Sequence, residues 1–324
     1  MKNKIILTKI FQKEAVDILK KDYDLIIVEG SGKDLKTTLK NNPDTEVIIS
    51  FLSDKIDRDI IEISDNLKII SNYAVGYNNI DFIFARDSGI FVTNTPDVLT
   101  AATADLTMAL ILGVSRRIVE SDKYMRSGKF KGWGANLLLG RELGGLTLGI
   151  IGLGKIGLAT ALRARAFGIN IAYYSNNRKP DLEKKFNFEY MELEELIKNS
   201  DIISPHIPYS DDVHHLFNKN TFEKMKDNAI FINVSRGGIM NESHLADALE
   251  SKKLFGAGLD VFEFEPRVND RLNKLDNVIM VPHIGSATYT ARLGMANIVI
   301  KNIKQVFSGK VPENLIPEHN VLKS

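Results

Sequence analysis

The chain has 324 residues, with 42 Lys and Arg against 41 Asp and Glu, and no cysteine. This length favours two domains, and the balanced charge gives no electrostatic reason to expect nucleic acid or an anionic membrane as a partner. The lack of cysteine excludes disulfides and thiolate chemistry, and no apolar run approaches the roughly 18 residues that span a bilayer. We therefore expect a cytoplasmic protein with neither a membrane nor a nucleic-acid partner.

The first hundred residues alternate short apolar runs with polar stretches that favour helices, such as KEAVDILKK. The apolar runs are IILT, DLIIVE, EVIIS, LKIIS and IFVTN. This alternation predicts a parallel sheet with covering helices. Because no phosphate-binding glycine fingerprint occurs here, we expect this half to bind substrate rather than nucleotide.

The middle of the chain begins with TAATADLTMALILGVSRRIVESDKYMR, from Thr100 to Arg126, which predicts one long helix. Residues 128–145 are rich in glycine and irregular, and they contain the only tryptophan, Trp133. A second strand–helix series starts at Thr147. Its strands are expected in INIAYY, DIISPHI, AIFINV, LFGAGLDV and NVIMVPH, and a last helix from Ala287 to about Phe307.

The most informative stretch is TLGIIGLGKIG, in which an apolar strand leads into G-x-G-x-x-G at Gly152, Gly154 and Gly157. The following LATALRARAFG has the spacing of a helix. In such a turn the first glycine permits the tight bend, the second lets the backbone approach a pyrophosphate, and the third lets the helix pack on the strand. The helix N-terminus then presents N–H groups to the phosphates. The stretch therefore predicts a dinucleotide cofactor.

The end of the second strand bears on which dinucleotide is used. An acidic residue about 20 positions beyond the fingerprint holds the ribose hydroxyls of NAD. Here INIAYY ends in Ser175, Asn176, Asn177, Arg178 and Lys179, without a carboxylate. These donors and positive charges suit a 2′-phosphate, so we expect NADP to be preferred, with NAD left open. The alternative is a polar turn with a basic pair by chance.

Charged side chains at three later strand ends form a set suited to hydride transfer. Arg236 follows AIFINV, Asp260 and Glu265 follow LFGAGL, and His283 follows NVIMVP, and doubly wound sheets bind ligands at such carboxyl ends. A histidine exchanges the alcohol proton near neutral pH. A neighbouring glutamate stabilises its protonated form and fixes its tautomer, and an arginine binds a carboxylate through two parallel bonds.

The other histidines are less suggestive of chemistry. His206 follows a strand near the expected position of the adenine end of the dinucleotide. His214 and His215 are adjacent and expected to face different directions, while His244 and His319 are expected to face solvent. Because none has the partners of a metal site, we predict no metal.

The chain resembles the D-isomer-specific 2-hydroxyacid dehydrogenases over essentially its whole length. The matching blocks are NYAVGYNNID, TAATADLTMALIL, GIIGLGKIG, INVSRGG, GLDVFEFEP and VPHIGSAT, in the family's order. The resemblance implies an α/β fold of two doubly wound parallel-sheet domains, with a Rossmann nucleotide domain (97–286) inserted in a flavodoxin-like substrate domain (1–96 plus 287–324) and the cofactor in the cleft between them. It also implies a homodimer built largely through the long helix near Thr100.

The resemblance also implies a role for individual residues. Arg236 would bind the substrate carboxylate and polarise the keto group, His283 would be the acid/base, and Glu265 would orient it. The backbone N–H groups of Val75 and Gly76 would clasp the carboxylate. The expected cofactor-binding residues are Thr103, Gly152, Leu153, Gly154, Lys155, Ile156, Gly157, Ser175, Asn176, Asn177, His206, Pro208, Val234, Ser235, Asp260, His283 and Gly285. Leu52, which follows EVIIS, is expected to line the substrate pocket and to favour small 2-keto acids.

Within this family the chain looks most like glyoxylate/hydroxypyruvate reductases, because Tyr174 and Ser175 followed by an arginine–lysine pair resemble their second-strand end. Pro282, in front of His283, disfavours a formate dehydrogenase. We therefore expect NAD(P)H-dependent reduction of a small 2-keto acid to the D-2-hydroxy acid. Two alternatives remain: a D-lactate or 2-ketogluconate reductase of the same family, and a non-catalytic dinucleotide-sensing binding protein like the C-terminal-binding corepressors.

Overall fold

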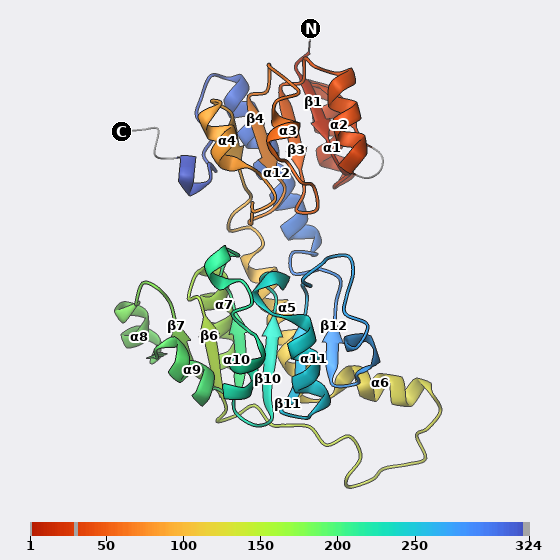
Figure 1. Ribbon diagram of the computed structural model, residues 1–324, viewed down its shortest axis with the longest axis vertical. Coiled ribbons are helices and arrows are strands. Elements are labelled where there is room, and N and C mark those ends of the chain that lie inside the picture. The colour runs from red at the N-terminus through yellow and green to blue at the C-terminus, as the bar shows by residue number, and fades with distance from the viewer. Residues whose placement is uncertain (1, 29–31, 320–324) are drawn as a thin grey trace. The chain divides into compact units, whose positions relative to one another are not determined.

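The computed structural model describes residues 2–28 and 32–319, and the chain divides into two compact units (Figure 1). Unit 1 comprises Met1–Leu99 with Ala287–Ser324, and unit 2 comprises Thr100–Ser286. Among the described residues, no helix combines the length and the apolar character that crossing a membrane requires. The predicted division into a substrate domain and a dinucleotide-binding domain stays a prediction at the level of function.

Unit 1 is built on a single parallel sheet. Its strands are β1 Lys4–Leu7, β2 Asp24–Ile27, β3 Val47–Ser50, β4 Ile69–Asn72 and β5 Phe91–Thr93, in the order β2-β1-β3-β4-β5. Its helices are α1 Lys13–Asp22, α2 Gly32–Asn41, α3 Arg58–Ile61, α4 Phe82–Asp87 and α12 Tyr289–Phe307. This strand order is that of flavodoxin-like folds. Glu29, which ends the predicted run DLIIVE, lies outside the described residues.

Helices cover both faces of this sheet, which is why its strands are apolar without alternation. On one face Ile6, Ile48, Ile70 and Val92 pack against the apolar residues of α2, α3 and α4. Helices α1 and α12 contact each other and, respectively, β2 and β4. Because helices cover both faces of the sheet, a ligand reaches it through the loops that follow the carboxyl ends of the strands.

Unit 2 contains the second parallel sheet. Its strands are β6 Thr147–Ile151, β7 Asn170–Tyr174, β8 Glu189–Tyr190, β9 Ile202–Pro205, β10 Ala229–Asn233, β11 Leu254–Leu259 and β12 Val278–Met280, in the order β12-β11-β10-β9-β6-β7-β8. Its α-helices are α5 Thr100–Ser115, α6 Ile118–Arg126, α7 Lys155–Arg165, α8 Pro180–Phe186, α9 Leu193–Asn199, α10 Lys219–Lys224 and α11 Glu242–Glu250. The first strand of the unit, β6, lies between β7 and β9, which is the point where a Rossmann sheet reverses its strand order.

Two apolar clusters sandwich the sheet of unit 2. Helices α5 and α7 cover one face, where Leu110 and Ala161 pack with Ile150 and Ile232. Helices α9, α10 and α11 cover the other, where Phe222 packs with Phe231. The predicted fold class, two doubly wound parallel sheets in an α/β chain, is confirmed.

The prediction of one helix from Thr100 to Arg126 is wrong. The helix stops at Ser115 and a second one, α6, begins after Arg117, whose φ of 52° is left-handed. The carbonyl of Ser115 accepts a hydrogen bond from the backbone N–H of Arg141 at 2.8 Å. This contact comes from a segment distant in sequence, so local helix propensity could not reveal the break.

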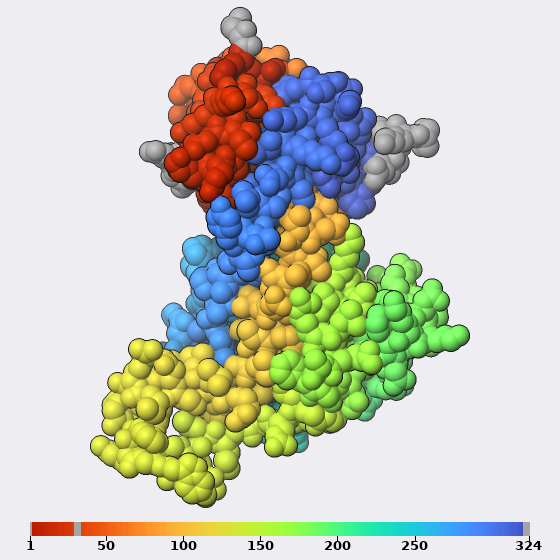
Figure 2. All heavy atoms as spheres, turned by 180° about the vertical axis from the view of Figure 1, so that it is seen from behind, coloured from red at the N-terminus to blue at the C-terminus, as the bar shows by residue number. Residues whose placement is uncertain are grey.

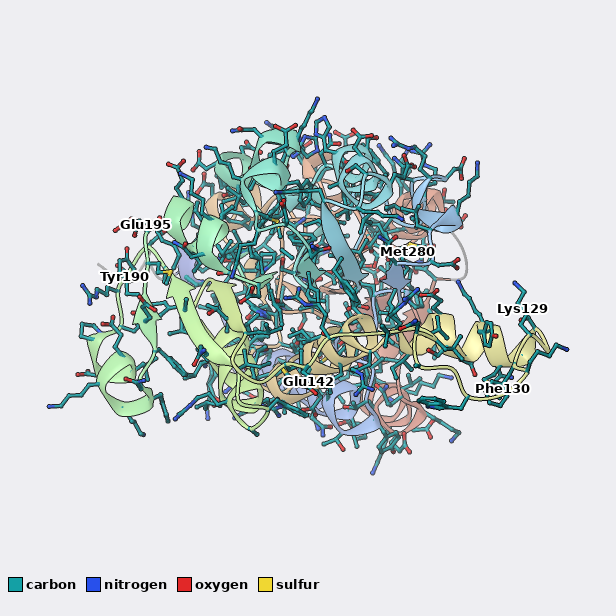
Figure 3. The ribbon with its side chains drawn as sticks, turned by 90° about the horizontal axis from the view of Figure 1, so that it is seen from below. Lys129, Phe130, Glu142, Tyr190, Glu195 and Met280 are labelled. Carbon is teal, nitrogen blue, oxygen red and sulfur yellow. The ribbon has the colours of Figure 1, made fainter. Side chains whose placement is uncertain are left out.

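Residues 127–146, which we call the arm, contain no helix or strand, as predicted. The arm extends away from the rest of unit 2 (Figure 2), and Lys129 and Phe130 lie at its outer end, far from Tyr190 and Glu195 (Figure 3). Trp133 on the arm is 88% exposed. The arm therefore presents apolar side chains to solvent within this chain.

Three expectations about histidines are also wrong. His319 is buried, and its ring Nε2 lies 2.9 Å from the carbonyl oxygen of Ile90. His244 is half-buried rather than exposed. The rings of His214 and His215 stack with centroids 3.8 Å apart instead of facing different directions, and His215 has a left-handed φ of 51°.

Candidate active site

The glycine turn after β6 has the geometry that a dinucleotide requires. Gly152 has a φ of 95°, which side chains rarely adopt, and a Cβ there would lie 2.8 Å from the carbonyl oxygen of His206. A Cβ on Gly157 would lie 2.3 Å from the carbonyl oxygen of Gly152, so the start of α7 packs directly on the turn. Next to Gly154, by contrast, no atom lies within 4 Å of the Cβ position. The turn thus leaves open space where α7 begins.

Beyond the carboxyl end of β7, the positive charge of Arg178 is already paired with a carboxylate of the same chain. The Arg178 guanidinium forms two hydrogen bonds to the carboxylate of Glu183, at 2.9 and 2.8 Å. Tyr173 donates to the same carboxylate at 2.6 Å. The Arg178 and Tyr173 hydrogen bonds lower the pKa of Glu183 to about 2, so this carboxylate is ionised and engages Arg178. Ser175 is partly exposed, and Asn176 and Asn177 are exposed.

Arg236 lies three residues beyond the end of β10, and two buried contacts fix the backbone around it. Asn233, fully buried, donates from Nδ2 to the carbonyl oxygen of Arg236 at 2.9 Å and accepts from the Ser235 hydroxyl. Gly237 lies so close to the backbone of Phe262 that a Cβ would approach its carbonyl oxygen to 1.9 Å. Burial lowers the pKa of Arg236, with Glu265 opposing the shift, and an arginine remains protonated near neutral pH. Asn233 was not singled out from the sequence, although its position as the last residue of an apolar strand is a signal.

Asp260 fastens the loop that follows β12. Its carboxylate accepts hydrogen bonds from the backbone N–H groups of Ile284 and Gly285, at 2.5 and 2.8 Å. The Thr103 hydroxyl donates to the carbonyl oxygen of Gly285 at 3.1 Å. Burial raises the pKa of Asp260 above its ordinary value, while these N–H groups and His283 oppose the rise. The structure thus brings together three of the expected cofactor-binding residues, because Gly285 is hydrogen-bonded to both Asp260 and Thr103.

His283 and Glu265 form the hydrogen-bonded pair that the sequence predicts. Nδ1 of His283 lies 2.9 and 3.2 Å from the two carboxylate oxygens of Glu265. The backbone N–H of Phe262 also donates to Glu265, at 3.0 Å. Burial would raise the pKa of Glu265, but the hydrogen bond and charge of His283, the Phe262 N–H and Arg236 outweigh it and hold the pKa below its ordinary value. Because Glu265 occupies Nδ1, the remaining ring nitrogen, Nε2, is left for proton transfer.

The remaining expected residues occupy the carboxyl ends of their strands. His206 follows β9, and its Nε2 lies 3.1 Å from the Ser204 hydroxyl. Burial lowers the pKa of His206 to about 4, so its ring is neutral near pH 7. Val234 is buried at the end of β10, whereas Pro208 is exposed. Leu153 is buried, Lys155 is exposed, and Ile156 is partly buried at the start of α7.

The three expected substrate-binding residues other than Arg236 belong to unit 1. Leu52 follows β3 and is half-buried, and Val75 and Gly76 follow β4 and are half-buried. Each therefore follows the carboxyl end of a strand in the sheet of unit 1. Among the described residues, no group of three or more His, Asp or Glu side chains has an arrangement that could hold a metal ion.

The fold and these strand ends define a dehydrogenase with a dinucleotide site. Residues 108–285 match the model of the D-isomer specific 2-hydroxyacid dehydrogenase NAD-binding domain. The chain belongs to the D-isomer-specific 2-hydroxyacid dehydrogenase family and is an NAD(P)-dependent oxidoreductase.

Individual relatives of known reaction type are similar to the chain over nearly its whole length. The chain is 44% identical to a glyoxylate reductase from Thermococcus litoralis, over 98% of this chain and 97% of that protein. Among solved structures it is similar to an NADPH-dependent glyoxylate/hydroxypyruvate reductase from Sinorhizobium meliloti, in complex with NADP and malonate (30% identity, 98% of each chain, TM-score 0.90). It is also similar to a D-lactate dehydrogenase from Aquifex aeolicus, complexed with NAD and lactic acid (30% identity, 96% of this chain and 98% of that one, TM-score 0.84).

The glycine turn yields a prediction that separates folding from cofactor binding. We expect Gly154→Ala to keep the melting temperature within about 2 °C of wild type, because its φ of −80° is ordinary and its Cβ meets no atom. The same methyl group would occupy the space for the pyrophosphate, so the KM for NAD(P)H should rise at least about tenfold. Thermal unfolding and steady-state kinetics measure the two effects.

Gly157→Ala is the matched control, because its Cβ would collide with the Gly152 carbonyl and should lower the melting temperature clearly. An unchanged KM for NAD(P)H in Gly154→Ala would contradict the assignment of this turn to the cofactor.

Proposed function

We propose that the protein reduces a small 2-keto acid, glyoxylate or hydroxypyruvate, to the D-2-hydroxy acid with NAD(P)H. The observation that carries this proposal is the Glu265–His283 pair at the sheet edge that also bears Arg236 and the glycine turn. The relatives called glyoxylate reductase, at 44 and 42% identity over 98% of the chain, support this substrate class.

The proposed reaction uses His283 as the proton donor. Bound NAD(P)H supplies the hydride to C2 of the keto acid. As negative charge develops on the keto oxygen, Nε2 of His283 donates a proton to it, and the Glu265 carboxylate stabilises the imidazolium from Nδ1. Arg236 binds the substrate carboxylate and polarises the keto oxygen. The backbone N–H groups of Val75 and Gly76 supply further donors to the carboxylate.

The cofactor contacts are proposed on the same basis. The glycine turn, with Leu153, Lys155 and Ile156, would hold the pyrophosphate at the N-terminus of α7. Residues beyond the other strand ends would hold the rest of the dinucleotide: Thr103, Ser175, Asn176, Asn177, His206, Pro208, Val234, Ser235, Asp260 and Gly285. Neutral His206 and the open space beside Gly154 fit such a ligand.

We also propose a homodimer. The observation that supports it is the group of exposed apolar side chains on α6 and the arm: Ile118, Val119, Met125, Phe130, Trp133, Leu137 and Leu139. Helix α5 is largely buried in unit 2, so α6 and the arm are the better candidates for the contact. The cytoplasmic location and the lack of a membrane or nucleic-acid partner stay predictions.

The substrate assignment is tested by initial rates with NADPH and NADH in parallel. We expect glyoxylate and hydroxypyruvate to be reduced with a kcat/KM at least about tenfold above that for pyruvate or 2-ketogluconate. A higher kcat/KM with pyruvate would favour a D-lactate dehydrogenase. If NAD(P)H binds and none of these keto acids is reduced, the proposed activity is wrong and a dinucleotide-sensing protein is the better interpretation.

The preference for NADP is tested at Arg178. We propose that Arg178 binds the 2′-phosphate of NADP and that Glu183 competes for it. Glu183→Gln keeps an acceptor for Tyr173 but weakens the grip on Arg178, so the KM for NADPH should fall severalfold while that for NADH stays constant. Arg178→Ala should raise the KM for NADPH.

Lys184→Ala, which removes one positive charge from the adjacent helix α8, is the control and should change neither KM. If Arg178→Ala leaves the ratio of the KM values for NADPH and NADH unchanged, the guanidinium does not bind the 2′-phosphate.

A further inference from the structure

The loop after β4 has three successive backbone carbonyls that are each held by a donor. The backbone N–H of Thr95 donates to the carbonyl oxygen of Ala74 at 2.8 Å. The side-chain amide of Asn94 donates to the carbonyl oxygen of Val75 at 2.8 Å, and the side-chain amide of Asn72 donates to the carbonyl oxygen of Gly76 at 2.7 Å. All the donors and acceptors belong to unit 1. Three consecutive peptide groups are therefore fixed in orientation.

Fixing a carbonyl also fixes the N–H of the next residue, because the two groups point in opposite directions across a trans peptide. The N–H groups of Val75, Gly76 and Tyr77 must point away from the three bracing donors. None of these N–H groups donates to an acceptor in the described part of the chain, and all three residues are partly exposed. The loop thus presents three oriented donors at the carboxyl edge of the sheet.

The brace at Asn72 is itself immobilised. Asn72 is the last residue of β4 and is fully buried. Its Oδ1 accepts a hydrogen bond from the hydroxyl of Ser50 at 3.0 Å, and Ser50 is the fully buried last residue of β3. Because Ser50 occupies the amide oxygen, the amide nitrogen is left to face the Gly76 carbonyl. The hydroxyl of Tyr77, in the same loop, lies 2.9 and 3.0 Å from the two oxygens of the Glu318 carboxylate.

We infer that Asn72 and Asn94 are positioning residues for the substrate carboxylate, and that Tyr77 N–H is available to it beside the N–H groups of Val75 and Gly76. This inference rests on the proposed function. The physical reason is that donors fixed before binding need no reorientation when the anion arrives. Without its asparagine a peptide group can rotate, and its N–H then spends part of its time turned away from the carboxylate.

The experiment compares an anionic substrate with its neutral counterpart. Wild type, Asn72→Ala and Asn94→Ala are assayed with glyoxylate and with its methyl ester, and the KM for NAD(P)H is measured alongside. Either substitution should lower kcat/KM for glyoxylate about tenfold, the effect of one lost hydrogen bond to a charged group. The value for the ester and the KM for NAD(P)H should stay near wild type. The preference for the acid therefore falls.

Ser71→Ala is the matched control. Ser71 is fully buried in the same strand and bonds Thr93 at 3.0 Å, so its loss costs a buried hydrogen bond without touching the loop. It should leave the preference for the acid unchanged. Melting temperatures identify any variant that fails to fold, and half-buried Asn94 provides the second variant if Asn72→Ala does so.

Equal losses for glyoxylate and ester, or an unchanged preference in both asparagine variants, would overturn the inference while leaving the proposed activity intact. A wild-type enzyme that reduces glyoxylate no better than the ester would also overturn it. Failure of the proposed function looks different, because wild type would then either reduce no 2-keto acid or prefer pyruvate or 2-ketogluconate to glyoxylate.

Discussion

Parallel alignment of the strands is the constraint on which the site depends. In unit 2, strands β6, β9, β10, β11 and β12 all run in one direction, so their carboxyl ends meet at one edge. The glycine turn, His206 and Asp260 each follow such an end directly, and Arg236 lies three residues beyond the end of β10. His283 follows another, three residues beyond β12, and it reaches Glu265 because β11 and β12 are neighbours. A change of register in any one of these strands would disperse the set.

The carboxylates near His283 have different environments and different tasks. Asp260 is 1% exposed and accepts two backbone N–H groups, and burial raises its pKa. Its hydrogen bonds hold the loop that carries His283 in place. Glu265 is 37% exposed at its side chain, and its contacts with His283, Phe262 and Arg236 outweigh desolvation and keep it ionised. A negative charge therefore stands beside Nδ1, where it stabilises a protonated ring. Asp260 thus fixes the position of His283, and Glu265 provides the ionised carboxylate beside its ring.

Most of the fold followed from the sequence, and the exceptions have physical reasons. Apolar runs and the glycine fingerprint mark strands and one cofactor turn, because these features depend on local periodicity and backbone freedom. The end of α5 depends on a contact between Ser115 and Arg141, and the burial of His319 on a contact with Ile90; neither partner is close in sequence. The engagement of Arg178 by Glu183 was not foreseen either, although only five residues separate them, because it depends on the backbone path between β7 and α8 and not on hydrophobic periodicity. The pairing of Glu265 with His283 was predicted from family resemblance and strand order.

The most direct test is the rate of keto-acid reduction by Glu265→Gln and by His283→Ala beside wild type, with the KM for NAD(P)H measured in each variant. Neutral glutamine no longer orients His283 through an ionised carboxylate at Nδ1, so kcat should fall at least about tenfold while the KM for NAD(P)H stays constant. His283→Ala should lose about 10² to 10⁴ in kcat. Near-normal turnover in both variants would contradict the assignment of this pair to proton transfer.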